Sequence, residues 1–206
     1  MPKNLKFEAM KSVLSGKSTL FIHADLVKEI TEGVLFGKKY GCKTVIVGGK
    51  DSWMITDLLK SNNIAVVLSE VQDLPSRNDD DIDQPYKTPA MLKAAGIQFC
   101  MSVKGGWQTR NLPLMAGNAV GFGLAYEDAI TAITADAAKI LGIDATVGTL
   151  EVGKDATLII TEGDVLDMRT SKVIQAFIRG KDIDLDNKHQ QLYRRFKTKY
   201  DRQGSR

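Results

Sequence analysis

The chain has 206 residues, of which 43% are hydrophobic and 26% charged, and its formal net charge is +3. A chain of this size can bury a sizeable core in one or two compact units. So small a net charge gives no field that would favour nucleic acid, a membrane surface or acidic substrates. No apolar run is long enough to span a bilayer. The first sixteen residues lack the layout of a signal peptide, so any export signal would lie upstream and the cytoplasm is the default location.

The first half of the chain alternates strand-like apolar runs with segments of helical periodicity. A short helix is predicted over residues 5–14. Strands are predicted over 19–23, 43–47, 64–68 and 97–103, and helices over 25–40, 51–60 and 89–95, with a polar loop over 69–86. This alternation indicates βαβ units around a parallel sheet. Because crossovers are right-handed, four such units form either half of a barrel or a small open sheet.

Helix 25–40 has the clearest local signals. Leu26, Ile30 and Val34 recur every four residues and therefore share one face. Asp25 is expected to be its N-cap and Gly41 its C-cap.

After residue 103 the pattern changes. Helices are predicted over 111–123 and 126–141, followed by strands over 156–160 and 173–178 and turns at 153–155 and 180–182. The second helix carries an apolar stripe, which is expected to face the core and consists of Ile130, Ile133, Ala137 and Ile140 or Leu141. From Asn187 onward the chain is polar and basic. Leu192 and Phe196 lie four residues apart there, which favours a docking helix before a frayed end.

Two stretches carry a family likeness. The first is residues 142–160, which read GIDATVGTLEVGKDATLII. The second is the predicted helical stretch over residues 124–142, whose matching positions are Thr134, Ala138, Lys139, Leu141 and Gly142. The first resembles Gly-x-Leu-Glu-x-Gly-Lys-x-Ala-x-Leu, and the second resembles Thr-x-Asn-Pro-Ala-Lys-x-Leu-Gly with Asp136 and Ala137 in place of Asn and Pro. Both patterns are typical of the amidohydrolase superfamily, especially imidazolonepropionase-like and related cyclic-amide or dipeptide hydrolases. The likeness continues back to His23 and so covers nearly the whole chain.

The resemblance implies a fold. Family members are (β/α)8 barrels that hold one or two divalent metals at the carboxyl ends of the strands, where a metal-bound hydroxide attacks an amide or similar carbonyl. The chain is therefore expected to be an α/β protein that forms the C-terminal half of a TIM-type barrel. Residues 1–145 would supply strands five to eight with closing helices, 146–186 part of the small β-sandwich, and 187–206 a basic helix or tail.

The resemblance also implies which metal ligands to expect. The family uses His-x-His on strand one, often a Lys or carboxylate on strand four, a His on strand five, a His on strand six and an Asp on strand eight. His23 ends the predicted strand five and matches the strand-five ligand. The strand-six position falls on Gly48 or Gly49, and the strand-eight position falls on Ser102 or Val103. None of these four has the expected ligand atom, so His23 is the one predicted ligand.

These matches imply a function for the whole protein more than for this chain. The family reaction is metal-dependent hydrolysis of amide or cyclic-amide C–N bonds, and zinc is the expected cofactor. This chain alone is expected to bind zinc weakly and to be inactive. Its expected partner is a missing N-terminal half or a second copy, joined through exposed strand edges. The alternative is a degenerate, non-catalytic amidohydrolase-like binding protein. A free-standing open-sheet binding domain is a third possibility, against which the Gly-Lys-Asp-Ala turn argues.

Other sequence features have simpler interpretations. Trp107 and Arg110 follow predicted strand eight, where barrel loops meet substrate, and they are candidate substrate contacts, with loop packing as the alternative. Asp51 is expected to be a helix N-cap, with a replacement for the missing strand-six metal ligand as the alternative. The acidic residues 79–83 lack the pattern of a calcium loop and indicate a solvated charge run. The two cysteines, Cys42 and Cys100, are expected to be buried, reduced thiols. The basic tail indicates an amphipathic terminus without nucleic acid or membrane as partner.

Overall fold

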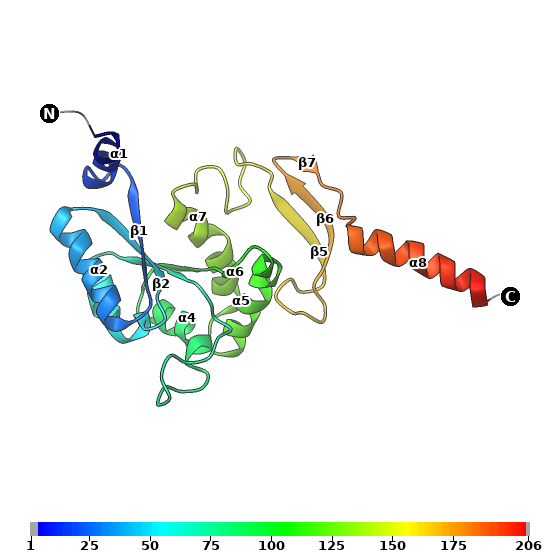
Figure 1. The fold of residues 1–206 in the computed structure, drawn as a ribbon, viewed down its shortest axis with the longest axis horizontal. Helices are drawn as coiled ribbons and strands as arrows, with labels where there is room; N and C mark the ends of the chain where they lie inside the picture. Colours follow the sequence, from blue (N-terminus) through cyan, green and yellow to red (C-terminus); the bar gives the residue numbers. More distant parts are fainter. Residues whose placement is uncertain (1–3, 205–206) are drawn as a thin grey trace. The chain divides into compact units, whose positions relative to one another are not determined.

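The computed structural model describes residues 4–204, which divide into two compact units (Figure 1). Unit 1 contains the chain up to Lys154 together with residues 166–169. Unit 2 contains residues 155–165 and the chain from Thr170 onward. Among the described residues, no helix combines the length and the apolar character needed to cross a bilayer.

Unit 1 is built around a four-stranded parallel sheet. The strands lie in the order β1 (Thr19–Ala24), β2 (Lys43–Gly48), β3 (Ala65–Leu68) and β4 (Phe99–Met101). Helix α1 (Leu5–Leu14) precedes β1. The connections are α2 (Val27–Tyr40), the 3₁₀ turn η1 (Ser52–Ile55) with α3 (Thr56–Ser61), and α4 (Gln84–Ala94). The predicted βαβ units and parallel sheet are therefore confirmed.

Several element bounds differ from the prediction. Helix α4 begins at Gln84, five residues before the expected start, because Pro85 is accommodated in its first turn. Strand β4 has three residues, Phe99–Met101, where seven were expected. Helix α2 has Leu26 at its N-cap position in place of the predicted Asp25, whereas Gly41 ends it at a φ of 66°, as predicted.

Three further helices follow β4 in unit 1. They are α5 (Leu112–Gly121), which follows the 3₁₀ turn η2 (Gln108–Asn111), then α6 (Tyr126–Ile133) and α7 (Ala135–Leu141). The single helix predicted over 126–141 is broken at Thr134, whose φ is −130° and ψ −90°. Of the predicted stripe, Ile140 is buried and Ile130, Ile133 and Ala137 are half-buried, whereas the alternative Leu141 is 58% exposed. The buried side consists of small residues that allow close packing, namely Ala129, Ala132, Ala135 and Ala138.

The two faces of the sheet have different coverings. Gly33 of α2 lies directly over one face, where a Cβ would be 3.2 Å from Ile22 Cγ2 and 3.4 Å from Ile46 Cδ1. Because strand side chains alternate, Phe21 and His23 point to the other face.

On that second face, α7 covers β2, β3 and β4. Val45 and Cys100 form a buried cluster with Ile140, and three partly buried side chains pack around it, namely Ala65, Val67 and Ala137. Phe21 and His23 of β1 stay exposed. Cys100 is buried, as predicted, whereas Cys42 is only half-buried, and neither is in a disulfide in this structure.

Unit 2 contains an antiparallel sheet and a long helix. Its strands are β5 (Leu158–Glu162), β6 (Lys172–Ile178) and β7 (Lys181–Asp182). The predicted turn at 180–182 lies one residue earlier: Arg179 and Gly180 form it with φ of 52° and 76°, as a type I′ hairpin requires. Helix α8 spans Lys188–Gly204, and every residue from Lys188 to Asp201 is exposed. The predicted docking of this helix through Leu192 and Phe196 is therefore not seen within unit 2.

Candidate functional site

The carboxyl ends of the four parallel strands meet at one edge of the sheet, which is where α/β folds place their ligands. His23 lies at the end of β1, in register with Val47 of β2. Gly48 and Gly49 follow on β2, and Ser102 follows β4. Among the described residues, no group of three or more His, Cys, Asp or Glu side chains lies close enough together to hold a metal ion.

The backbone after β2 excludes an imidazole at the position where the family pattern has one. Gly48 and Gly49 have φ of 109° and 67°, a region that residues with a side chain rarely adopt. A Cβ at Gly48 would collide with the Asp25 carboxylate and lie 3.0 Å from the Ala24 carbonyl oxygen, and a Cβ at Gly49 would lie 2.6 Å from Val66 Cγ1. Glycine is therefore required at both positions by the path of the chain.

The end of β4 likewise offers no carboxylate. The backbone N–H of Ser102 donates to the Leu68 carbonyl oxygen at 2.7 Å, and its hydroxyl donates to the same oxygen at 3.2 Å. Ser102 thus ties the end of β4 to the end of β3. Val103 beside it is half-buried.

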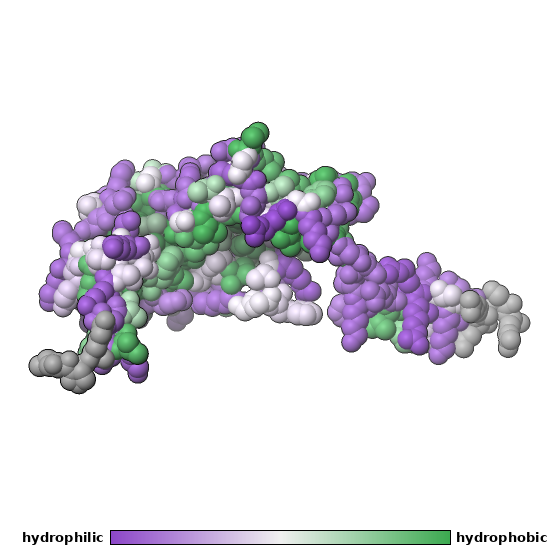
Figure 2. All heavy atoms as spheres, turned by 90° about the horizontal axis from the view of Figure 1, so that it is seen from above, coloured by the Kyte–Doolittle hydropathy of each residue, from purple (hydrophilic) through white to green (hydrophobic). Residues whose placement is uncertain are grey.

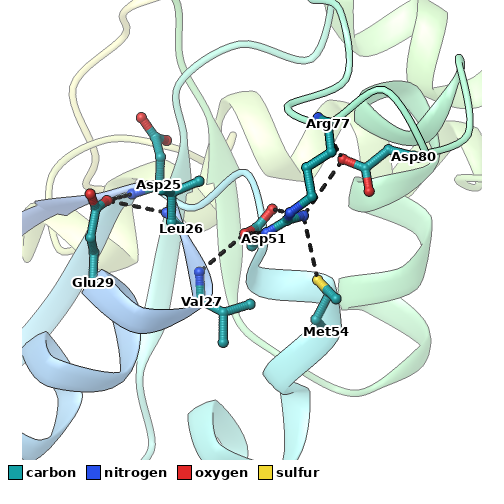
Figure 3. A network of polar contacts seen from close by, with 8 residues as sticks. All are labelled: Asp25, Leu26, Val27, Glu29, Asp51, Met54, Arg77 and Asp80. Carbon is teal, nitrogen blue, oxygen red and sulfur yellow. Dashed lines mark hydrogen bonds and ion pairs between the residues drawn. The ribbon is translucent and has the colours of Figure 1, made fainter.

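Asp51 is a buried charged group at this edge, and its side chain is 2% exposed (Figure 3). The Arg77 guanidinium donates to both of its carboxylate oxygens, at 3.2 Å and 2.5 Å. The backbone N–H of Val27 donates to the same carboxylate at 3.1 Å. Asp51, in the loop after β2, therefore caps the first turn of α2, which follows the neighbouring strand β1. The sequence predicted instead that Asp51 caps the helix that follows it, but its side chain makes no cap hydrogen bond there.

Two neighbours complete this network. The Glu29 carboxylate accepts from the backbone N–H groups of Asp25 and Leu26 at 3.1 and 3.2 Å, which lowers the pKa of Glu29. The hydrogen bond from Arg77 to Asp51 raises the pKa of Arg77. Arg77 lies 26 residues beyond Asp51, inside a polar loop, and no local pattern in the sequence singles it out.

Further along the same edge, Lys50 forms an ion pair with Asp73 at 2.5 Å. This hydrogen bond raises the pKa of Lys50. Burial opposes ionisation of Asp73, but the hydrogen bonds from Lys50 and from the Leu74 N–H outweigh it and lower the pKa of Asp73. Lys104 lies 3.8 Å from Glu70. The cavity among these groups measures about 20 Å³, which is room for about one water molecule.

The acidic run is held by internal ion pairs. Lys87 binds Asp81 at 2.5 Å and Asp83 at 2.7 Å, and Asp80 lies 3.6 Å from Arg77. The loop is charged, as predicted, and the carboxylates of Asp80, Asp81 and Asp83 pair with Arg77 and Lys87 of the same chain.

The two predicted substrate contacts lie together in the segment after β4. The Arg110 guanidinium stacks over the Trp107 ring at 4.8 Å from its centroid. Trp107 is 70% exposed and Arg110 is also exposed. Neither residue is among those that line the small cavity beside Lys50.

A family model described as "Amidohydrolase family" matches residues 24–183. The amidohydrolase tasK of Hapsidospora irregularis is 26% identical over 124 residues, which are 52% of this chain and 12% of that protein.

Two solved structures share the fold. An amidohydrolase from Thermotoga maritima MSB8 superposes with a TM-score of 0.80 at 24% identity, over 89% of this chain and 48% of the other. An adenosine deaminase from Xanthomonas campestris with bound zinc has a TM-score of 0.58 at 17% identity, over 97% of this chain and 54% of the other. The chain therefore spans about half the length of these structures.

Proposed function

This chain belongs to the amidohydrolase family, and we propose that it is the C-terminal half of a metal-dependent barrel hydrolase that cleaves amide or cyclic-amide C–N bonds. The observation that carries the proposal is the position of His23 near the carboxyl end of β1, on the open face of the sheet and one residue before the matched region begins. An imidazole there is placed to enter a metal site whose other ligands come from outside this sequence.

The surface around β1 supports the half-barrel. Phe21 and His23 are exposed on the face away from α2. Helix α1, which precedes β1, buries none of its residues, and its large apolar side chains are between 53% and 78% exposed, namely Leu5, Phe7, Met10 and Leu14. An unpaired strand edge beside exposed apolar side chains is the surface that a neighbouring strand and its helix would cover in a closed barrel.

The residues of this chain do not by themselves fit a hydrolytic metal. Catalytic zinc takes about three protein ligands, and the described residues place one histidine at this edge, with glycines at the strand-six position and Ser102 and Val103 at the strand-eight position. We therefore assign no step of the hydrolysis to this chain alone. In a completed barrel His23 would hold the metal, and Trp107 and Arg110 would contact substrate from the loop after β4. The cytoplasm remains our expected location.

The second candidate is a degenerate amidohydrolase that binds a ligand without cleaving it. It is favoured by the strand-six position, where Gly48 and Gly49 supply no ligand atom and their positive φ values would strain any side chain. An in-frame His-x-His after a short apolar strand in the upstream genomic sequence would favour the hydrolase, and its absence the binding protein.

A zinc titration tests the role of His23, and the chain provides its own control. The sequence has two histidines, His23 and His189, and the second lies on the exposed helix α8. We expect weak zinc binding, followed through the imidazole resonances, that is lost in His23→Ala and kept in His189→Ala, with no amide hydrolysis by the chain alone. Tight, near-stoichiometric zinc together with amide hydrolysis by this chain would refute the proposal.

A further inference from the structure

Helix α8 has one apolar side that no other part of unit 2 covers. Leu192, Phe196 and Tyr200 recur every four residues and Tyr193 lies three before Phe196, so these side chains share one side of the helix. Their exposed fractions lie between 37% and 65%. The helix begins at Lys188, beyond the residues 24–183 that the family model matches.

Positive charges border this apolar side on both flanks. Lys188, Arg195 and Lys199 lie three or four residues from Leu192 or Phe196 and run along one flank. On the other flank lies Lys197, whose ammonium is 5.9 Å from the centroid of the Tyr193 ring. Arg194 lies elsewhere on the helix and pairs with Asp186 at 2.6 Å. Among the described side chains, none of the four flanking cations forms an ion pair with an acid.

This arrangement fits an anionic lipid surface better than other partners. A helix with a narrow apolar side that is edged by Lys and Arg lies flat in a bilayer interface, where the cations reach the headgroups while their stems and the Tyr rings stay at the apolar boundary. Seventeen residues are too few heptads for a coiled coil with a second copy. Binding to nucleic acid would gather the cations on one face toward the phosphates instead of dividing them around an apolar strip. Figure 2 shows α8 covered largely by hydrophilic residues, with a small hydrophobic patch among them.

We propose that α8 binds the surface of a bilayer containing anionic phospholipid, with Leu192, Phe196 and the two tyrosines at the headgroup boundary. The small net charge of the whole chain, +3, predicts no membrane partner, and the local arrangement on α8 is what points to one. This proposal is independent of the hydrolase proposal, because it uses no residue of the strand-end site.

Vesicle co-sedimentation of the full chain tests it. We expect binding to vesicles of phosphatidylcholine with about one-third phosphatidylserine, much weaker binding to phosphatidylcholine alone, and a loss of affinity as salt rises. Phe196→Ser is expected to lower the affinity at least about tenfold, because it removes the aromatic ring that binding would bury in the bilayer interface. The double variant Lys197→Gln, Lys199→Gln is expected to lower it about thirtyfold.

Thr198→Ala is the matched control, since Thr198 lies on the side of the helix opposite Phe196. It is expected to bind like the unchanged chain, and far-ultraviolet circular dichroism would verify that all variants keep their helix. Three outcomes would overturn the proposal: no binding of the full chain at millimolar lipid, equal losses in Phe196→Ser and Thr198→Ala, or an oligomer that forms through Phe196 and does not bind vesicles. Binding to a single-stranded RNA that exceeds vesicle binding and survives Phe196→Ser would also overturn it.

Discussion

Asp51 joins three segments of unit 1 through one buried carboxylate. It accepts hydrogen bonds from the Arg77 guanidinium and from the Val27 N–H, so the first turn of α2 and the loop after β3 are both fixed to the end of β2. A buried carboxylate is tolerated only when such partners compensate for its lost hydration. The ion pair of Asp51 with Arg77 is thus one of several that fix the path of the loop over residues 69–83.

Arg77→Ala is expected to destabilise the protein clearly more than the loss of an ordinary surface charge, because it leaves the Asp51 carboxylate buried without its cation. Adding Asp51→Asn should recover part of this loss, because the neutral amide still accepts from the Val27 N–H. Urea unfolding would measure both. The control is Arg110→Ala, which removes an exposed arginine and should cost less than about 0.5 kcal/mol. Equal losses from Arg77→Ala and Arg110→Ala would contradict this account.

The ion pair of Asp73 with Lys50 makes stability depend on pH. The pKa of Asp73 is lowered on folding, so its contribution is fully present above the ordinary value of 3.8 and is lost as pH falls through the lower folded value. Asp73→Asn should therefore be less stable than the unchanged chain at pH 6, and the two should converge as pH falls below 3. Free energies of unfolding at a series of pH values would check this, and a gap that stays constant to pH 2 would count against it.

At the scale of elements, α2 is fitted to the sheet through glycine. Gly37 lies so close to Thr44 of β2 that a Cβ there would collide with the Thr44 side chain, and Gly33 lies against Ile22 and Ile46. Glycine lowers helix propensity by about 1 kcal/mol relative to alanine. Its presence in the middle of α2 is explained by close packing of the helix against β1 and β2.

Gly37→Ala is therefore expected to destabilise unit 1 by about 1–3 kcal/mol, despite the better helix propensity of alanine. Thr44→Ala in the same chain should restore part of the loss, since it removes the atoms that collide. Lys38→Ala, at the exposed neighbouring position, serves as the control and should be near neutral. These differences would appear in urea midpoints. Stabilisation by Gly37→Ala alone would mean that α2 and β2 lie farther apart than described.

At the scale of the whole molecule, unit 1 is an open sheet with an unpaired strand at each side. The exposed side chains of α1 and the exposed Phe21 add apolar surface beside β1. On the second face of the sheet, Ile140 and Ala137 of α7 already cover β2, β3 and β4. The exposed face of the sheet that is left to a partner therefore lies at the β1 side, and the edge of β4 is unpaired as well.

We expect this surface to cause association in solution. Light scattering should show a mass that rises with protein concentration, and Phe7→Gln should reduce the rise because Phe7 is 69% exposed on α1. Phe196→Ser, on α8, should leave the association unchanged. A clean monomer at high concentration would contradict the expectation.

The sequence by itself determined the parallel βαβ sheet, the place of His23 at the end of its strand, the Gly41 cap and the family, because periodicity, glycine and short motifs are local signals. Only the tertiary structure decided that Asp51 caps α2 and pairs with Arg77, that the helix predicted over 126–141 breaks at Thr134, and that α7 covers the second face of the sheet. Those features depend on contacts between residues far apart in the chain. No pattern over a few neighbouring positions encodes such contacts. They form, and stabilise the fold, only when folding brings distant segments together.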